Sequence, residues 1–330
     1  MTFSPTSEVA RVDLPVAQPF DAPGIFRFLA DRAVPGVEVA DLSQEDRLRY
    51  ARTLTLPHGP GAVEVVAQRA ECSTWRLGAR LELACAADVA PAVARVRQML
   101  DLDADPIAVD AALSADPMLA PLVAETPGMR VPGAVDPHEL VVRALIGQQI
   151  SVAAARAHLG RLVARSGPPY VSTFPDLDRL FPTAAQIVAA VPQPPADQPL
   201  DPGRPLRLPR AAIAAIRGLA GALAQGDLVI DASVDGERLR TQLLSRPRVG
   251  PWSAAYIAMR VLGDPDAWLD GDVALLAGAK ALGLIGHDVP KAAGHRLLAT
   301  RATAWAPWRS YAVGHLWAAT GRAATGKRPQ

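Results

Sequence analysis

Cysteine is nearly absent from this chain of 330 residues, which contains only Cys72 and Cys85. Two cysteines are too few for a disulfide framework, and these two do not have the spacing of a metal site. We expect both to be ordinary, buried, small side chains in a reducing cytoplasm. The sequence therefore gives no sign of a secreted, disulfide-stabilised protein.

Long hydrophobic runs are also missing from the chain. No apolar run reaches the roughly 18 residues that a membrane-spanning helix needs. The first 16 residues contain no basic stretch followed by an apolar one, so we expect no signal peptide. These absences predict a cytoplasmic protein that does not contact a membrane.

Lysine is scarce, and the three lysines, Lys280, Lys291 and Lys327, leave arginine to carry almost all of the positive charge. The net charge of +1 does not by itself indicate a nucleic-acid partner. The distribution is uneven, because residues 201–330 have 17 Lys and Arg against 10 Asp and Glu, whereas residues 101–200 have 6 against 11. An ordinary protein surface can show such a bias, and so can a surface that binds an anionic partner.

Half of the residues are hydrophobic, and their spacing changes along the chain. Helices are expected over residues 25–33 and 88–100, and again from Pro106 onward, where helices follow one another through short loops. Between the first two helices, apolar and polar residues alternate with period two in three stretches: 50–56, 61–67 and 74–83. The prediction is an α+β fold, in which an N-terminal α/β domain with an antiparallel sheet precedes a mostly α-helical domain.

Changes in composition suggest how the chain is divided. The acidic stretch 101–106 marks the expected boundary between the two domains. A segment with seven prolines is predicted to be an exposed loop or a partly disordered insertion. The predicted parts are a loose lead-in over 1–15, the sheet domain over 16–103, the helical domain over 104–320 with the insertion at 191–209, and a polar tail over 321–330.

The most informative stretch runs from Leu243 to Leu275 and predicts a helix, a tight turn, a second helix and a loop rich in carboxylates. Pro251 fits the first position of the second helix, because the N–H that proline lacks would be unpaired there. Gly250 before it permits a left-handed turn. The first-turn N–H groups of the second helix point outward and form a ready anion site. This arrangement is typical of a helix-hairpin-helix that grips a nucleic-acid backbone.

Four aspartates, Asp264, Asp266, Asp270 and Asp272, lie within nine residues after that second helix. The simplest interpretation of Asp272 is a helix N-cap, since an apolar helical pattern follows it. A metal site is disfavoured because no His or Cys lies nearby. In the functional interpretation, a carboxylate beyond a phosphate-binding hairpin faces the sugar of a nucleotide. There it would stabilise the positive charge that develops when an N-glycosidic bond breaks.

Aromatic residues are few, sixteen in all, yet several gather in the C-terminal third. Core packing is the usual fate of aromatics at helical spacing. The functional alternative is a pocket that stacks on an extruded base and favours a cationic one through cation–π attraction. The residues concerned are Trp252, Tyr256, Trp268, Trp305, Trp308, Tyr311 and Trp317.

The run from Leu243 to Ala274 resembles the helix-hairpin-helix DNA glycosylases, in which this motif ends in a catalytic Asp. Further stretches make the chain similar to the AlkA-type branch, the bacterial 3-methyladenine DNA glycosylases II. The likeness extends in order over about residues 16–320. The stretches that carry it are Phe20-Asp21, Phe28 to Val34, Arg143 to Ser151, Pro307 to Ala312 and His315 to Trp317.

The resemblance implies that the helical domain has two subdomains with the active-site cleft between them. It identifies Asp272 as the catalytic residue. The aromatic positions around the base pocket are Trp252, Tyr256, Trp317 and Phe28. The DNA-binding positions are Arg248, Val249, Gly250, Ser253, Gln148 and Gln149, with Gln149 as the side chain that wedges into the duplex. The family's alkali-ion site, for Na⁺ or K⁺, maps onto the backbone carbonyls of Leu244, Arg246 and Val249.

The sequence departs from the family pattern at three of these positions. Arg248 replaces the first glycine of the hairpin and must tolerate the dihedral angles of the turn. Val273 follows the catalytic Asp where an aromatic is often expected, and Gln149 is polar where a leucine wedge is expected. These differences affect the shape of the pocket and the contact with the duplex.

Two absences narrow the class that the resemblance implies. Bifunctional relatives carry a lysine nucleophile two residues after the last glycine of the hairpin, where this chain has Trp252, so a Schiff base cannot form at that position. Iron–sulfur relatives need four cysteines. We therefore expect a monofunctional enzyme without AP lyase activity that requires no cofactor.

The expected function is a monomeric, nucleoid-associated glycosylase of base excision repair. It would flip alkylated bases, of the 3-methyladenine and 7-methylguanine type, out of duplex DNA and hydrolyse their N-glycosidic bonds. Two alternatives remain open at this point. One is a glycosylase for deaminated or oxidised bases, and the other is a non-catalytic DNA-binding protein that senses damage.

Overall fold

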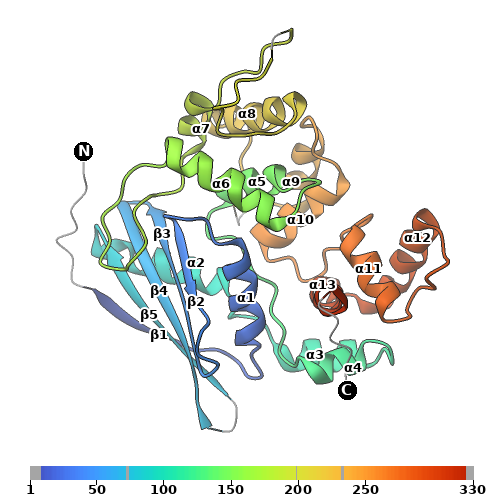
Figure 1. Ribbon diagram of the computed structural model, residues 1–330. Helices are drawn as coiled ribbons and strands as arrows, with labels where there is room; N and C mark the ends of the chain where they lie inside the picture. The colour runs from blue at the N-terminus through green and yellow to red at the C-terminus, as the bar shows by residue number, and fades with distance from the viewer. Residues whose placement is uncertain (1–8, 72–73, 198, 232–233, 325–330) are drawn as a thin grey trace.

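The computed structural model describes residues 9–71, 74–197, 199–231 and 234–324, and it has the predicted α+β architecture (Figure 1). The strands are β1 (Ala10–Leu14), β2 (Glu38–Asp41), β3 (Arg47–Leu56), β4 (Gly59–Arg69) and β5 (Trp75–Leu83). Helices of the first half are α1 (Ala22–Arg32), α2 (Val89–Met99), α3 (Pro106–Ser114), α4 (Ala120–Glu125), α5 (Pro137–Ile146) and α6 (Val152–Ser166). Those of the second half are α7 (Ala184–Ala190), α8 (Arg210–Gln225), α9 (Gly236–Leu244), α10 (Pro251–Leu262), α11 (Val273–Ala281), α12 (Lys291–Ala302) and α13 (Arg309–Ala324).

The sheet is antiparallel throughout and has the strand order β1-β5-β4-β3-β2. β3 and β4 form a tight hairpin in which Leu56 pairs with Gly59 across the turn. Side chains alternate between the two faces of the sheet, as period two requires. On one face Tyr50, Leu54 and Val63 pack with α1 and α2. On the other face Ala51 and Ala62 are covered by a segment that arrives from the helical half and contributes Tyr170, Phe174 and Leu177.

The predicted lead-in and tail are each wrong in part. Residues 10–14 form the edge strand β1, which pairs with β5 from Ala10 opposite Leu81 to Leu14 opposite Leu77. The residues from Ala10 to Leu14 do alternate between apolar and polar side chains, so the period-two signal was present in the sequence and the prediction did not use it. At the other end, α13 continues to Ala324, so residues 321–324 are helical. Residues 1–8 and 325–330 lie outside the described part of the chain.

The predictions for the cysteines and for the proline-rich loop agree with the structure only in part. Cys85 is half-buried rather than buried, and Cys72 lies outside the described residues. The predicted loop 191–209 has no regular structure where it is described, and Figure 1 shows it projecting between α7 and α8. It is not wholly exposed, however, because Val191, Leu206 and Leu208 are buried in the helical core.

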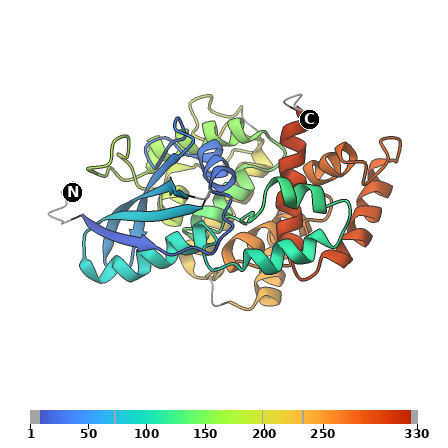
Figure 2. The same cartoon turned by 90° about the horizontal axis from the view of Figure 1, so that it is seen from below.

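Helix α10 lies between two hydrophobic cores of the helical half. Ala254, Ile257 and Val261 on one side of it pack into the core formed by α5 to α10. Met259, on another side, packs into the core formed by α3, α4 and α11 to α13. Seen from below, the sheet lies at one end of the molecule and the orange and red helices α11 to α13 lie at the other (Figure 2). Residues of α10 between these cores are therefore placed to line a cleft.

None of the helices among the described residues combines the length and the apolar character needed to cross a bilayer.

Candidate active site

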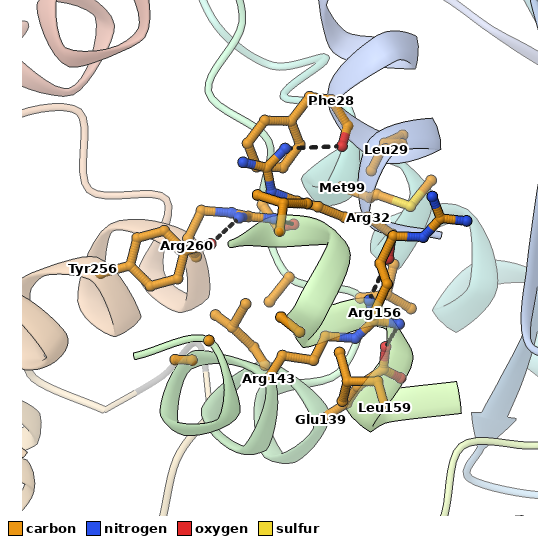
Figure 3. Close-up of a pocket in the computed structure, with 18 of the residues that line it drawn as sticks. Phe28, Leu29, Arg32, Met99, Glu139, Arg143, Arg156, Leu159, Tyr256 and Arg260 are labelled. Carbon is orange, nitrogen blue, oxygen red and sulfur yellow. Dashed lines mark hydrogen bonds and ion pairs between the residues drawn. The ribbon is translucent and has the colours of Figure 1, made fainter. Parts of the chain in front are cut away.

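A cavity of about 230 Å³ lies where α1 of the sheet domain meets α5, α6 and α10 (Figure 3). Helix α13 contributes Trp317 to its lining. The structure brings five of the residues singled out from the sequence together around it. Asp272 lines the cavity together with the four aromatic residues Phe28, Trp252, Tyr256 and Trp317. These residues come from distant parts of the chain, so only the tertiary fold assembles them.

Asp272 is buried, with 8% of its surface exposed, and both of its carboxylate oxygens accept a hydrogen bond. Oδ1 accepts from the backbone N–H of Leu275 at 2.9 Å, which makes Asp272 the N-cap of α11. Oδ2 accepts from the indole Nε1–H of Trp252 at 2.7 Å. Asp272 is therefore both a helix N-cap and a residue of the cavity wall, and the cap fixes its carboxylate at that wall.

The aromatic residues of the cavity form an ordered group. The rings of Trp252 and Tyr256 are stacked, with centroids 5.2 Å apart and planes within 5° of parallel. They lie one helical turn apart on α10, so the same face of that helix presents both. The ring of Trp317, from α13, is tilted by 56° to that of Tyr256 with 6.5 Å between centroids. Such a group offers flat, apolar surface to a planar base, beside the carboxylate of Asp272.

The remaining aromatics of the C-terminal third lie elsewhere. Trp268, Trp305, Trp308 and Tyr311 belong to the core of α3, α4 and α11 to α13. For these four residues the structure agrees with ordinary core packing. The spacing of the aromatic residues in the sequence did not distinguish those that line the cavity from those in the core.

The other three aspartates of the carboxylate loop do not line the cavity either. Asp266 accepts two hydrogen bonds from Arg309, each of 2.7 Å, and these hydrogen bonds hold the pKa of Asp266 below its usual value. Asp264 Oδ1 accepts from the backbone N–H of Asp266 at 2.8 Å. Asp270 is exposed. Asp272 is thus set apart from its neighbours by position.

Five arginines line the cavity, and none of them was singled out from the sequence as a site residue: Arg32, Arg52, Arg143, Arg156 and Arg260. Arg32 lies four residues after Phe28 on α1, and Arg260 lies four residues after Tyr256 on α10, so each shares a helix face with an aromatic residue of the pocket. The guanidinium carbon Cζ of Arg32 is 3.7 Å from the centroid of the Phe28 ring, and that of Arg260 is 4.9 Å from it. This i, i+4 spacing was the signal that could have revealed both.

A buried ion network forms part of the cavity wall. Glu38 of β2 accepts hydrogen bonds from Tyr50, Arg52 and Arg143, and Glu139 of α5 accepts from Arg52 at 2.7 Å. Burial alone would raise the pKa of Glu38, but the charges of Arg143 and Arg52 outweigh it and lower the pKa to about 2. The network joins the sheet to the helical half and so fixes β2 and β3 relative to α5.

The hairpin between α9 and α10 differs from the expected backbone geometry. Arg248 is the residue with the left-handed conformation, at a φ of +63°. Gly250 is extended, with φ −91° and ψ 178°, and serves as the N-cap of α10. The expectation that Gly250 makes the left-handed turn is therefore wrong. No side chain caps this helix end, and both residues are exposed.

The loop between α5 and α6 is fastened to this hairpin. Nε2 of Gln148 donates to the carbonyl oxygen of Arg248 at 3.0 Å and to Oγ of Ser253 at 2.8 Å. Gln149, the next residue, is exposed and has a φ of +62°. Ser253 itself is buried and its hydroxyl is used inside the protein, as is the side-chain amide of Gln148. Gln149 and Arg248 therefore project from neighbouring loops, each in a conformation that non-glycine residues rarely adopt.

The three carbonyls expected to bind an alkali ion belong to the end of α9 and the turn after it. Backbone carbonyl oxygens are ligands that hard cations accept. The carbonyl of Arg246 accepts the backbone N–H of Val249 at 3.2 Å, so one of the three takes part in the turn itself. Val249 is buried and anchors the turn in the core. Ion binding at Leu244, Arg246 and Val249 stays a prediction.

The comparisons with known proteins find relatives that are named AlkA or DNA-3-methyladenine glycosylase. The family model described as the AlkA N-terminal domain matches residues 11–136. A protein of Mycobacterium tuberculosis named "Probable bifunctional transcriptional activator/DNA repair enzyme AlkA" is 43% identical over 305 residues, which are 92% of this chain and 56% of that protein. The chain thus spans little more than half the length of that curated relative. "DNA-3-methyladenine glycosylase 2" of Escherichia coli K12 is 33% identical over 302 residues, which are 91% of this chain and 94% of that protein.

Solved structures show the same fold at lower sequence identity. The 3-methyladenine DNA-glycosylase of Archaeoglobus fulgidus superposes with a TM-score of 0.73 at 18% identity, covering 94% of this chain and 98% of that one. The structure of MBOgg1 in complex with a low-affinity DNA ligand superposes with a TM-score of 0.68 at 16% identity, covering 99% and 100% of the two chains. At these identities the likeness concerns the fold alone.

Proposed function

This chain belongs to the AlkA family of DNA glycosylases, and from that premise we propose that it excises alkylated bases from duplex DNA by hydrolysis. The products would be a free base, such as 3-methyladenine or 7-methylguanine, and an abasic site. The observation that carries the proposal is the doubly held carboxylate of Asp272 in the wall of an aromatic cavity. A fixed anion and a set of flat apolar rings are the two features that this reaction needs.

The proposed reaction begins when the damaged nucleotide is flipped out of the helix. The backbone N–H groups at the start of α10, which no side chain caps, would hold the DNA backbone. The exposed Arg248 would add a phosphate contact, and the exposed Gln149 would fill the gap in the duplex. Flipping costs least at a damaged base, which is poorly paired or stacked. The aromatic rings of the cavity then stack against the base and favour one with positive charge.

Bond cleavage follows from the position of Asp272. The bond between the sugar carbon C1′ and the base nitrogen breaks, its electron pair leaves with the base, and positive charge develops on the sugar. The carboxylate of Asp272 stabilises that charge without reorganisation, because Trp252 and Leu275 hold both oxygens. Water adds its oxygen to C1′, and its proton passes to the carboxylate and then to solvent. A cationic base departs neutral, so no strong general acid is needed.

We further propose that the protein acts as a monofunctional, monomeric enzyme at the nucleoid, without AP lyase activity. Among the described residues no lysine lines the cavity. Lys280 donates to the carbonyls of His287 and Val289, at 3.0 and 2.8 Å. These observations support hydrolysis over Schiff-base chemistry, which requires an amine at the sugar carbon.

The test is single-turnover base release from methylated duplex DNA, with the released base identified, by wild type and by Asp272→Asn. Asparagine keeps the N-cap of α11 and removes the charge, so we expect release to fall at least a hundredfold while DNA affinity changes little. The matched control is Asp270→Asn, an exposed neighbour that should retain full activity. Equal release by wild type and Asp272→Asn would refute the mechanism. Release only of deaminated or oxidised bases would refute the substrate class, and no release at all would favour a damage sensor.

A further inference from the structure

Three arginines gather around His158, outside the candidate active site. Arg161 lies three residues after His158 on α6, so the two side chains share one face of that helix. Arg204 and Arg207 come from the end of the proline-rich segment 191–209. None of these four residues lines the cavity of the candidate active site. The cluster is therefore a separate feature that takes no part in the proposed cleavage.

His158 joins the two segments that carry the arginines. Its Nδ1 accepts a hydrogen bond from Nη2 of Arg161 at 2.8 Å and another from the backbone N–H of Arg207 at 3.2 Å. These two donors assign the unprotonated ring nitrogen to Nδ1. Burial lowers the pKa of the imidazole, and the charges of Arg161, Arg207 and Arg204 lower it further. His158 is therefore a neutral acceptor that holds the cations together and adds no negative charge to them.

The positive charge of the cluster has no counter-charge in the protein. Throughout the part of the chain that the structure describes, no carboxylate forms an ion pair with any of the three arginines. The carboxylate of Asp201 accepts from the backbone N–H of Gly203 at 2.7 Å, and Arg204 donates to the backbone carbonyl of Asp201 instead. Burial and the charge of Arg207 lower the pKa of Arg161. Like charges are thus held close together at a cost that a bound anion would relieve.

Helix α6 is basic, although the part of the sequence around it is acidic. The helix contains three arginines and no Asp or Glu, whereas residues 101–200 as a whole have 6 Lys and Arg against 11 Asp and Glu. It begins at Val152, just after the loop of Gln149 that is expected to enter the duplex. At 1.5 Å per residue, Arg161 lies about 14 Å along the helix from that loop, which is the rise of about four base pairs. This is a distance at which a flanking phosphate of bound DNA would be found.

We propose that Arg161, Arg204 and Arg207 form a phosphate-binding site for the backbone of duplex DNA beside the lesion. Guanidinium groups bind phosphate oxygens through charge-assisted hydrogen bonds, and the phosphate would neutralise the cluster. Counterions released from the DNA would add to the affinity. The site contributes affinity and not recognition of the damaged base, because phosphate contacts carry no direct sequence information. This inference rests on the proposed function, since it names a further part of the surface that would bind the same DNA.

The test measures the coupling between Arg207 and individual phosphates of the DNA. Single phosphates of a duplex with a stable abasic-site analogue are replaced, one at a time and on both strands, by neutral methylphosphonates. The affinity of each duplex for wild type and for Arg207→Gln is measured by fluorescence anisotropy. We expect one or two flanking positions at which the replacement weakens binding by wild type about fivefold and leaves binding by Arg207→Gln unchanged. For the unmodified duplex, the variant should lower the slope of log affinity against log salt by about one unit.

Arg207 suits this test because its loss removes no contact that holds the fold. Its side chain is exposed, and its one described hydrogen bond is that of its backbone N–H, which glutamine keeps. Arg207→Lys keeps the charge and should keep most of the coupling. Arg76→Gln, the matched control, removes an exposed arginine from β5 and should show the full coupling of wild type. A loss of coupling in Arg76→Gln as well would mean that net charge, and not this site, is responsible.

A second arm identifies the source of the phosphate. Inorganic phosphate alone is titrated against the protein, and the line width of its phosphorus NMR signal is followed. Broadening that Arg207→Gln loses, with no coupled position in the DNA, would assign the site to a free phosphate and overturn the inference. Absence of both effects would also overturn it. Coupling to a DNA phosphate without release of methylated bases would refute only the proposed function, whereas normal release without coupling would refute only this inference.

Discussion

Arg248 shows how a single residue can combine backbone strain with an exposed position. Its φ of +63° is a conformation in which a side chain beyond glycine costs about 1–2 kcal/mol. Its carbonyl oxygen also accepts the hydrogen bond from Gln148 that joins two loops at 3.0 Å. The turn therefore holds a strained residue at a surface where an arginine can reach a phosphate.

This strain can be measured with two variants that lack the same side chain. Arg248→Gly relieves the conformation, whereas Arg248→Ala keeps a Cβ at the same φ. We expect the glycine variant to be more stable than the alanine variant by about 1 kcal/mol, measured as the difference in free energy of unfolding in urea. Both variants should lose the same DNA affinity, because both lose the guanidinium. Equal stabilities would show that the turn is not strained.

At the scale of elements, the proline-rich segment 191–209 shows why an irregular stretch need not be a passive loop. Val191 at its start and Leu206 and Leu208 at its end are buried in the core of α5 to α10. Arg161 of α6 also donates to the carbonyl of Pro205 at 3.3 Å. The segment is therefore attached at both ends, and the attachment positions the start of α8.

A matched pair of substitutions tests this attachment. Leu206 is 1% exposed, so Leu206→Ala leaves a cavity and should destabilise the protein by about 2–5 kcal/mol. Pro202→Ala, at an exposed position of the same segment, should change stability by no more than about 0.5 kcal/mol. Thermal melting of the two variants beside wild type gives the comparison. A small effect of Leu206→Ala would mean that the segment is not part of the core.

For the whole molecule, Asp101 joins parts that are distant in the sequence. It lies between α2 and α3, and its Oδ2 accepts from the backbone N–H of Val131 and from the hydroxyl of Tyr311 on α13, each at 3.0 Å. Burial raises its pKa to about 6, although these two hydrogen bonds oppose the shift. The junction between the sheet domain and the last helix therefore contains a carboxyl group that titrates near pH 6.

The sign of the resulting pH dependence follows from proton linkage. Between about pH 4 and pH 6 the folded protein binds the proton on Asp101 and the unfolded chain does not, so this contribution to stability falls as the pH rises through that window. Asp101→Asn removes the titration and keeps an acceptor for Val131. We expect the stability of wild type relative to Asp101→Asn to decrease from pH 4 to pH 6.5, measured by urea unfolding at each pH. A constant difference would contradict the raised pKa.

Local chemistry determined what the sequence by itself could predict. Capping and proline placement located the starts of α10 and α11, because an N-cap or first-turn proline acts within four residues. Period-two alternation located β3, β4 and β5 for the same reason. The family motif singled out Asp272 and the aromatic positions that line the cavity. These signals lie within one turn of helix, one strand or one short run of residues.

Only the tertiary structure decided how those pieces meet. The short strands β1 and β2 exist because they pair with β5 and β3, and Tyr170 to Leu177 covers a sheet face that lies about a hundred residues earlier in the chain. The hydrogen bond from Trp252 to Asp272 and the cations of Arg32 and Arg260 beside Phe28 depend on side chains brought together from α1, α10 and α11. Long-range packing sets such contacts, and no pattern of neighbouring residues encodes them. The sequence determined which residues could do the chemistry, and the fold decided which of them share one pocket.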